Sequence, residues 1–223
     1  MRFVTVLLAL LAAVSILSPR PADAHPHVFI DTDVALVFGK SGRLEAVRVT
    51  WAYDDFYSLM MIEDAGLDAN GDGVPDPDRL RAFAGQDVDW KAGFPGHIYL
   101  ERQDKPIALG PPRDHVARFA NGRIITSHVR PLTQPVAVTK SAPLRLRVYD
   151  PEYFVAYDTP RDPTIEGRRD CKVSHRAPDT SGQTDLLAEL QNLDTQTDSL
   201  QIMQMPDVGV FFAKRFEVAC GAS

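Results

Sequence analysis

The sequence predicts a β-rich α+β fold, an antiparallel sheet or sandwich with one inserted helix–loop–helix. Alternating apolar and polar residues flank turn sequences along most of the chain, whereas helical spacing is clearest over residues 55–85. The 223 residues are 44% hydrophobic and 24% charged, as in globular proteins. The net charge of −6 argues against nucleic acid as a partner, because nucleic acid requires a basic surface.

The first 24 residues have the pattern of a secretory signal peptide. Arg2 gives a positive start, residues 3–17 are mostly apolar, and Ala22-Asp23-Ala24 offers small residues around a cleavage point. The apolar run is shorter than the ~20 residues that a membrane-spanning helix needs. An uncleaved anchor is the alternative. We expect an exported protein that begins at His25, forms one domain over residues 25–223 and has no membrane span once mature.

A hairpin is predicted at the mature start, with strands over residues 27–38 and 43–55 around the turn residues 39–42. Pairing Phe38 with Arg43 places the apolar residues of both strands on one face. In this register His27 lies opposite Asp54, and Asp33 lies opposite Arg48. A shift of two residues would change the pairs but keep the faces.

Two helices follow, the first over residues 55–64, with Phe56, Leu59 and Met60 at helical spacing. The second begins at Pro77 after the N-cap Asp76 and ends near Gly85. An Asn121-Gly122 turn predicts a second hairpin. Residues 158–182 are expected to be mostly loop and residues 185–193 a short helix. The further strands are expected at residues 97–102, 106–109, 114–120, 123–130, 144–149, 153–157 and 215–220.

Cys171 and Cys220 are the two cysteines of the chain, and export makes a disulfide between them the expected state. Closing a loop of about 50 residues would contribute roughly 4 kcal/mol in the chain-entropy model. A metal or redox role is the alternative. The sequence offers Cys171 and His175 four residues apart for such a role, but it has no Cys-x-x-Cys.

The expected mature start, His25-Pro26-His27, is the first candidate metal site. His25 and His27 share one side of a strand, and Asp54 faces His27 in the predicted register. Two imidazoles, the terminal amine and a carboxylate suit zinc, nickel or copper. Pro26 has no amide N–H, which rules out the square-planar amino-terminal motif. A solvated start without metal is the alternative.

The second candidate is a calcium loop. Its positions 1, 3, 5, 7 and 9 are Asp68, Asn70, Asp72, Val74 and Asp76. Position 12 is Arg79 instead of the usual bidentate Glu, so only weak calcium binding is predicted. A metal-free loop held by Asx turns is the alternative.

The third candidate is a pair of histidines. The Asn121-Gly122 turn places His115 opposite His128, with Cβ atoms about 5 Å apart, close enough to share a metal ion. Half-buried packing is the alternative. The sequence contains neither a phosphate-binding loop nor a nucleophile elbow, so we assign no catalytic residue.

Four segments together resemble one protein family: residues 25–31, 49–57, 68–73 and 149–154. The family is the periplasmic domain of unknown function 1007. Its members are described as periplasmic components of ABC-type transport systems, and some are similar to the soluble partner of a nickel/cobalt-type permease in zinc transport. By this resemblance His25 and His27 match the opening His-x-His. At residue 79 the family tends to carry Glu, whereas this chain has Arg.

The resemblance and the residues together lead to one main functional hypothesis. It is a periplasmic accessory protein that binds zinc, or nickel or cobalt, and passes the ion to an inner-membrane permease. A secreted copper enzyme with an N-terminal histidine brace is the alternative. A third hypothesis is a structural or ligand-binding β domain whose histidines have no metal role.

Overall fold

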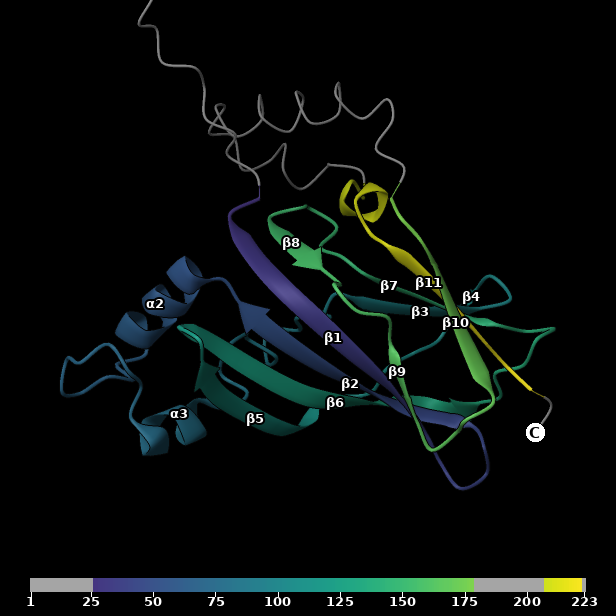
Figure 1. Ribbon diagram of the computed structural model, residues 1–223, viewed down its shortest axis with the longest axis horizontal. Helices are drawn as coiled ribbons and strands as arrows, with labels where there is room; N and C mark the ends of the chain where they lie inside the picture. The colour runs from purple at the N-terminus through teal and green to yellow at the C-terminus, as the bar shows by residue number, and fades with distance from the viewer. Residues whose placement is uncertain (1–25, 179–206, 222–223) are drawn as a thin grey trace, which may run out of the picture.

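A computed structural model describes residues 26–178 and 207–221, which form two β-sheets and two α-helices (Figure 1). The expected signal peptide, His25 and the expected helix at 185–193 lie outside the described residues. One sheet has the strand order β5-β6-β2-β1-β8, with β9 also paired to β1, and the other has the order β10-β11-β7-β3-β4. The elements are β1 (Val28–Phe38), β2 (Leu44–Tyr53), α2 (Asp55–Asp64), α3 (Pro77–Phe83), β3 (Ile98–Arg102), β4 (Lys105–Pro106), β5 (Arg113–Ala120), β6 (Arg123–Val136), β7 (Leu144–Val148), β8 (Val155–Asp158), β9 (Thr164–Glu166), β10 (Cys171–Arg176), the 3-10 turn η2 (Gly209–Phe211) and β11 (Arg215–Cys220).

The β-rich α+β class is confirmed, and the apolar faces of both sheets meet in one core. Trp51 on β2 is 1% exposed, as its position in the alternating pattern predicts. Phe216 on β11 and Leu146 on β7 enter the same core from the other sheet. Among the described residues, none forms a helix with the length and apolarity needed to span a membrane.

The first hairpin forms with the predicted faces, but its register differs from the prediction by two residues. Val34 pairs with Val49 and Asp33 pairs with Thr50, so Asp33 does not face Arg48. The turn is one residue longer than predicted, because Phe38 pairs with Leu44. A bulge at the next pair adds the second residue of the shift.

Both helices begin and end where the sequence predicts, but α2 buries a different face from the one that its apolar spacing indicates. Phe56, Leu59 and Met60 are exposed, whereas Ser58, Met61 and Ile62 are buried. The Ser58 hydroxyl explains part of this orientation. It accepts the backbone N–H of Ile124 and donates to the carbonyl of Tyr53, which fixes the helix to β6 and β2.

Residues 158–182 contain two strands that the sequence analysis did not predict. Strand β9 pairs in parallel with β1, and β10 pairs in antiparallel orientation with β11. Strand β8 also pairs in parallel with β1, so the first sheet is mixed and not purely antiparallel. The three short strands are placed by partners distant in the chain, and local alternation carries little information about such pairing.

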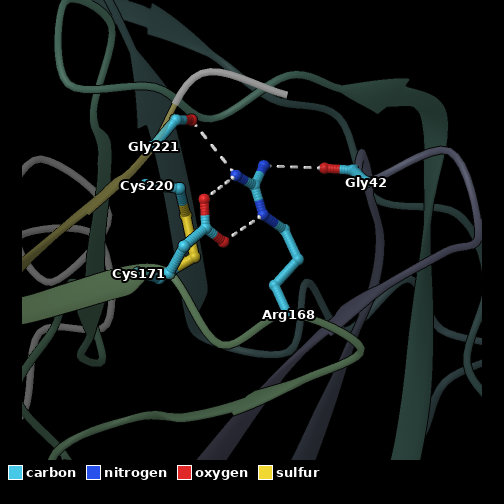
Figure 2. The surroundings of a disulfide bond; sticks show 6 residues. Gly42, Arg168, Cys171, Cys220 and Gly221 are labelled. Atoms are coloured by element: carbon cyan, nitrogen blue, oxygen red, sulfur yellow. Dashed lines mark hydrogen bonds and ion pairs between the residues drawn. A yellow bond between two sulfur atoms is a disulfide. The ribbon is translucent and has the colours of Figure 1, made fainter.

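The predicted disulfide is present between Cys171 and Cys220, which lie opposite each other on β10 and β11. Figure 2 shows Arg168 beside it, reaching both the turn after β1 and the end of β11. Its guanidinium binds the Asp170 carboxylate at 2.6 and 2.9 Å and the carbonyls of Gly42 and Gly221 at 3.0 and 3.1 Å. The hydrogen bonds from Arg168 lower the pKa of Asp170 to about 2. This junction connects the two sheets at one end of the molecule.

Candidate functional site

The start of β1 is held where three segments distant in the sequence meet. We call this site the N-terminal corner, and its residues are His27, Phe29, Asp54 and Phe154. The backbone N–H of His27 donates to the carbonyl of Phe154 at 2.9 Å, and the two rings lie 4.6 Å apart. The backbone N–H of Phe29 donates to the Asp54 carboxylate at 3.0 Å. The first residues of β1 are therefore fixed against both the end of β2 and the loop before β8.

Asp54 has a structural role in this corner that the predicted register missed. It follows the last residue of β2 and N-caps α2, where its second oxygen accepts the backbone N–H of Tyr57 at 2.8 Å. Its carboxylate lies against the β1 backbone two residues after His27, instead of facing His27 across a regular pair. The shifted register is the reason for this difference.

A cleft of about 340 Å³ opens beside the corner, between β1, β8 and the segment around η2. It is lined by Asp31, Asp150 and Asp158, together with apolar and tyrosine side chains. Asp31 is also held by Arg123 at 2.6 Å. No local sequence pattern indicates this cleft, because its walls come from three separate parts of the chain.

Asp150 connects the cleft to a buried histidine. Its carboxylate accepts the backbone N–H of Val155 at 2.9 Å and lies 3.6 Å from Nε2 of His97. Nδ1 of His97 is 3.0 Å from the hydroxyl of Tyr157. Burial lowers the pKa of His97, and the nearby Asp150 charge opposes this shift. His97 is thus part of a fixed polar contact between Asp150 and Tyr157.

The predicted pair His115 and His128 does lie close together, with ring centroids 6.0 Å apart. A register shift between Arg113 and Val116 places His115 in an irregular part of β5, so the two residues are not a regular cross-strand pair. His128 is 2% exposed, and its Nε2 has no hydrogen-bond partner among the residues that the structure describes. Burial, helped by the charges of His115 and Arg130, lowers the pKa of His128 to about 3.

The surroundings of this pair are aromatic. The indoles of Trp51 and Trp90 approach the His128 ring edge-on, with centroids 4.8 and 4.9 Å away. Trp90 comes from the loop after α3, to which the sequence analysis assigned no function. Neutral imidazoles can ligate metals, but this packing also fits the alternative of a histidine that fills an aromatic core.

The calcium-like loop is closed by its own backbone. Asp68 accepts the N–H groups of Gly71 and Gly73 at 2.8 and 2.7 Å, and these bonds lower its pKa. Asp76 accepts the N–H of Ala69 at 3.0 Å. Arg79, at position 12, lies with Nε 3.3 Å from the Asp76 carboxylate. The Asx turns of the metal-free alternative are therefore present, and the Arg79 cation stands beside a predicted ligand.

Over residues 26–178 and 207–221, no three histidine, cysteine or acidic side chains cluster in a way that could hold a metal ion. The predicted ligand His25 precedes this range.

The resemblance to a protein family is tested directly by comparison with family models. The family described as "Protein of unknown function (DUF1007)" matches residues 10–220. The chain belongs to this family. Among curated proteins no match is found.

The structure gives a reason why separate segments of this DUF1007 chain carry the resemblance. Residues 25–31, 49–57 and 149–154 are far apart in the sequence, but each contributes a contact to the N-terminal corner. The fourth segment, residues 68–73, lies in the loop between α2 and α3. The N-terminal corner is therefore the strongest candidate site of this DUF1007 protein.

Proposed function

We propose that this protein is a periplasmic accessory protein that binds a divalent metal ion, zinc or else nickel or cobalt, and delivers it to an inner-membrane permease. The ion would bind at the mature start through His25 and His27. The observation that carries the proposal is the N-terminal corner, because His27 is anchored there at both its backbone and its ring. A fixed first ligand lowers the entropy cost of assembling a site.

Acidic side chains near the corner favour a cation. Asp31 on β1 pairs directly with Asp158 on β8, and Asp54 lies at the end of β2 with Asp55 next to it. Arg123 forms an ion pair with Asp31. The Asp54 carboxylate oxygens have lone pairs beyond those used for the backbone, so it remains the proposed third ligand. A cluster of carboxylates raises the local concentration of divalent ions.

An exposed apolar patch beside the corner supports a protein partner. Phe56, Leu59 and Met60 share one face of α2 and are 71%, 55% and 41% exposed. Phe29, held at the start of the same helix by Asp54, is 52% exposed. Contiguous exposed apolar side chains mark interaction surfaces in soluble proteins. We assign this patch to contact with the permease, next to the site from which the ion would leave.

Zinc calorimetry on protein cleaved before His25 tests the site. One ion should bind, and His25→Ala and His27→Ala should each weaken binding at least tenfold, because each removes an imidazole ligand. Binding should also weaken in acid, since imidazole must be neutral to ligate. His175→Ala is the matched control, because His175 is exposed and paired with Asp162 at 2.7 Å.

If the His25/His27 double variant binds zinc as tightly as the parent, the N-terminal assignment is wrong. The pair His115 and His128 is then the next site to test, with His115→Ala as the accessible variant. If the parent protein binds no zinc, the transport proposal loses its basis.

The copper enzyme is the second candidate, favoured by the same histidine start. A histidine brace needs the terminal amine and a second histidine. In the described part of the chain, His97 contacts Tyr157 and Asp150, His175 contacts Asp162, and His128 packs on Trp51. Protein that retains extra residues before His25 separates the proposals. If the extended form binds metal as tightly as the cleaved protein, the terminal amine is not a ligand. If the cleaved protein consumes peroxide in a copper-dependent reaction and the extended form does not, the enzyme is favoured.

A further inference from the structure

Three arginines form a row across the outer face of the second sheet. Arg176 on β10 pairs directly with Arg215 on β11. The next ladder pairs Phe216 with Leu146, so Arg147 on β7 lies beside Arg215. Leu146 and Phe216 point into the core, and the arginines therefore point outward. Figure 1 shows the three strands that carry the row, β10, β11 and β7, with the yellow turn η2 just before β11.

The row is unusual because it brings three positive charges together on neighbouring strands. Like charges directly opposite each other destabilise a sheet. In the described ranges, none of Arg147, Arg176 and Arg215 forms an ion pair or a side-chain hydrogen bond. The adjacent row of the same sheet is arranged in the opposite way.

In that adjacent row, Arg145 on β7 lies between two carboxylates of neighbouring strands, Glu217 on β11 and Glu101 on β3. Arg145 also forms an ion pair with Asp104. The sheet thus neutralises one outward arginine with three acidic neighbours, whereas within residues 26–178 and 207–221 the three adjacent arginines have no ion-pair partner. This contrast indicates that the arginine row is arranged for an anion from outside the sheet.

A cleft of about 330 Å³ lies over the row. All three arginines line it, and Pro178, Val210 and Phe211 supply apolar walls. A guanidinium binds phosphate through two parallel N–H···O bonds, which suits several arginines around one group. Apolar walls would pack against the rest of an amphiphilic ligand.

We propose that the arginine row of Arg147, Arg176 and Arg215 is a binding site for a phosphate group, either free or carried by an anionic lipid headgroup. This site goes beyond the proposed metal function and shares no ligand with the N-terminal corner. The two proposals can therefore fail independently. The chemistry of the row is the same for both phosphate sources, and the experiment distinguishes them.

The test measures binding of inorganic phosphate by calorimetry, and binding of vesicles by co-sedimentation. The vesicles contain phosphatidylcholine either alone or mixed with phosphatidylglycerol. The variant is Arg147→Gln/Arg215→Gln. The control is Lys172→Gln, which removes the same kind of charge on the same face of β10, four residues and about 13 Å from Arg176. At physiological salt this spacing exceeds the screening length of about 8 Å.

Phosphate binding that is at least tenfold weaker in the double variant and unchanged in Lys172→Gln supports a free-phosphate site. Vesicle binding that requires phosphatidylglycerol and the row, without free-phosphate binding, supports a lipid headgroup. The double variant should also be at least as stable as the parent, because it relieves repulsion between like charges. The same binding and stability measurements can also overturn the proposal.

If the parent binds neither probe, or if Lys172→Gln loses as much binding as the double variant, the proposal is overturned. Residues 177–213 contain six acidic side chains and no Lys, Arg or His. If carboxylates of the protein's own chain neutralise the arginine row, the parent would bind neither probe and the double variant would lose stability. That combination would also overturn the proposal.

Discussion

His128 should make the stability of this protein fall in mildly acidic solution. The side chain is 2% exposed, and burial lowers its pKa from the ordinary 6.5 to about 3. The folded state therefore resists a proton that the unfolded chain accepts. A group with a lowered folded pKa contributes its full stability above the unfolded value of 6.5, and this contribution is lost as the pH falls from there towards 3.

The expected size of this effect follows from the two pKa values. At pH 5 the unfolded histidine is almost fully protonated and the folded one is not, which removes about 2 kcal/mol of unfolding free energy relative to pH 7.5. Below pH 3 the loss reaches about 5 kcal/mol, because each factor of ten in proton affinity corresponds to about 1.4 kcal/mol. The effect is large for a protein of ordinary stability, whose unfolding free energy is about 5–15 kcal/mol.

Urea unfolding at pH 7.5 and pH 5 tests this prediction in the parent and in His128→Phe, which keeps an aromatic ring between Trp51 and Trp90. His128→Gln is a second non-titrating variant in case the larger ring does not fit. His97, whose pKa is also lowered, is present in every protein and cancels in the comparison. The parent should lose about 2 kcal/mol more than either variant between the two pH values. Equal losses in parent and variants would refute the reasoning and show that His128 accepts a proton in the folded state.

Three further predictions concern other parts of the fold. Replacing both Cys171 and Cys220 by serine should lower the unfolding free energy by up to about 4 kcal/mol in urea titrations, since the crosslink closes a separation of 49 residues; a loss well under 1 kcal/mol would mean that the β10–β11 ladder holds these ends without it. Arg79→Glu should tighten calcium binding at least tenfold by calorimetry, because it supplies the missing carboxylate and removes a cation from beside Asp76; unchanged affinity would place residue 79 away from the ion. Asp54→Ala should cost about 1–2 kcal/mol, because it removes the cap of α2 and the acceptor of the Phe29 amide; a similar cost for Asp55→Ala would show that charge, and not capping, is responsible.

Local patterns in the sequence predicted much of the fold. The bounds of α2 and α3, the two main hairpins and the buried position of Trp51 follow from spacing and turn residues, because burial on one face imposes a fixed period on a strand or helix. The disulfide followed from the two cysteines of the chain together with the expectation of export. The family followed from four short segments whose combination is specific.

The candidate sites depended on contacts that no local pattern encodes. A bulge and one extra turn residue shifted the first hairpin by two positions, so Asp54 capped α2 instead of facing His27. The apolar spacing of α2 gave the helix but not its buried face, which the Ser58 hydrogen bonds help to set.

The sequence by itself determined most of the segments that form strands and helices, and which residues have ligand chemistry. Only the tertiary structure decided that His27 meets Phe154, that His128 is enclosed by Trp51 and Trp90, and that three arginines form one row. The physical reason is that burial periodicity depends on each segment alone. Pairing of distant strands depends on the competition among all segments for the same neighbours, and a charge becomes unusual only when its neighbours are known.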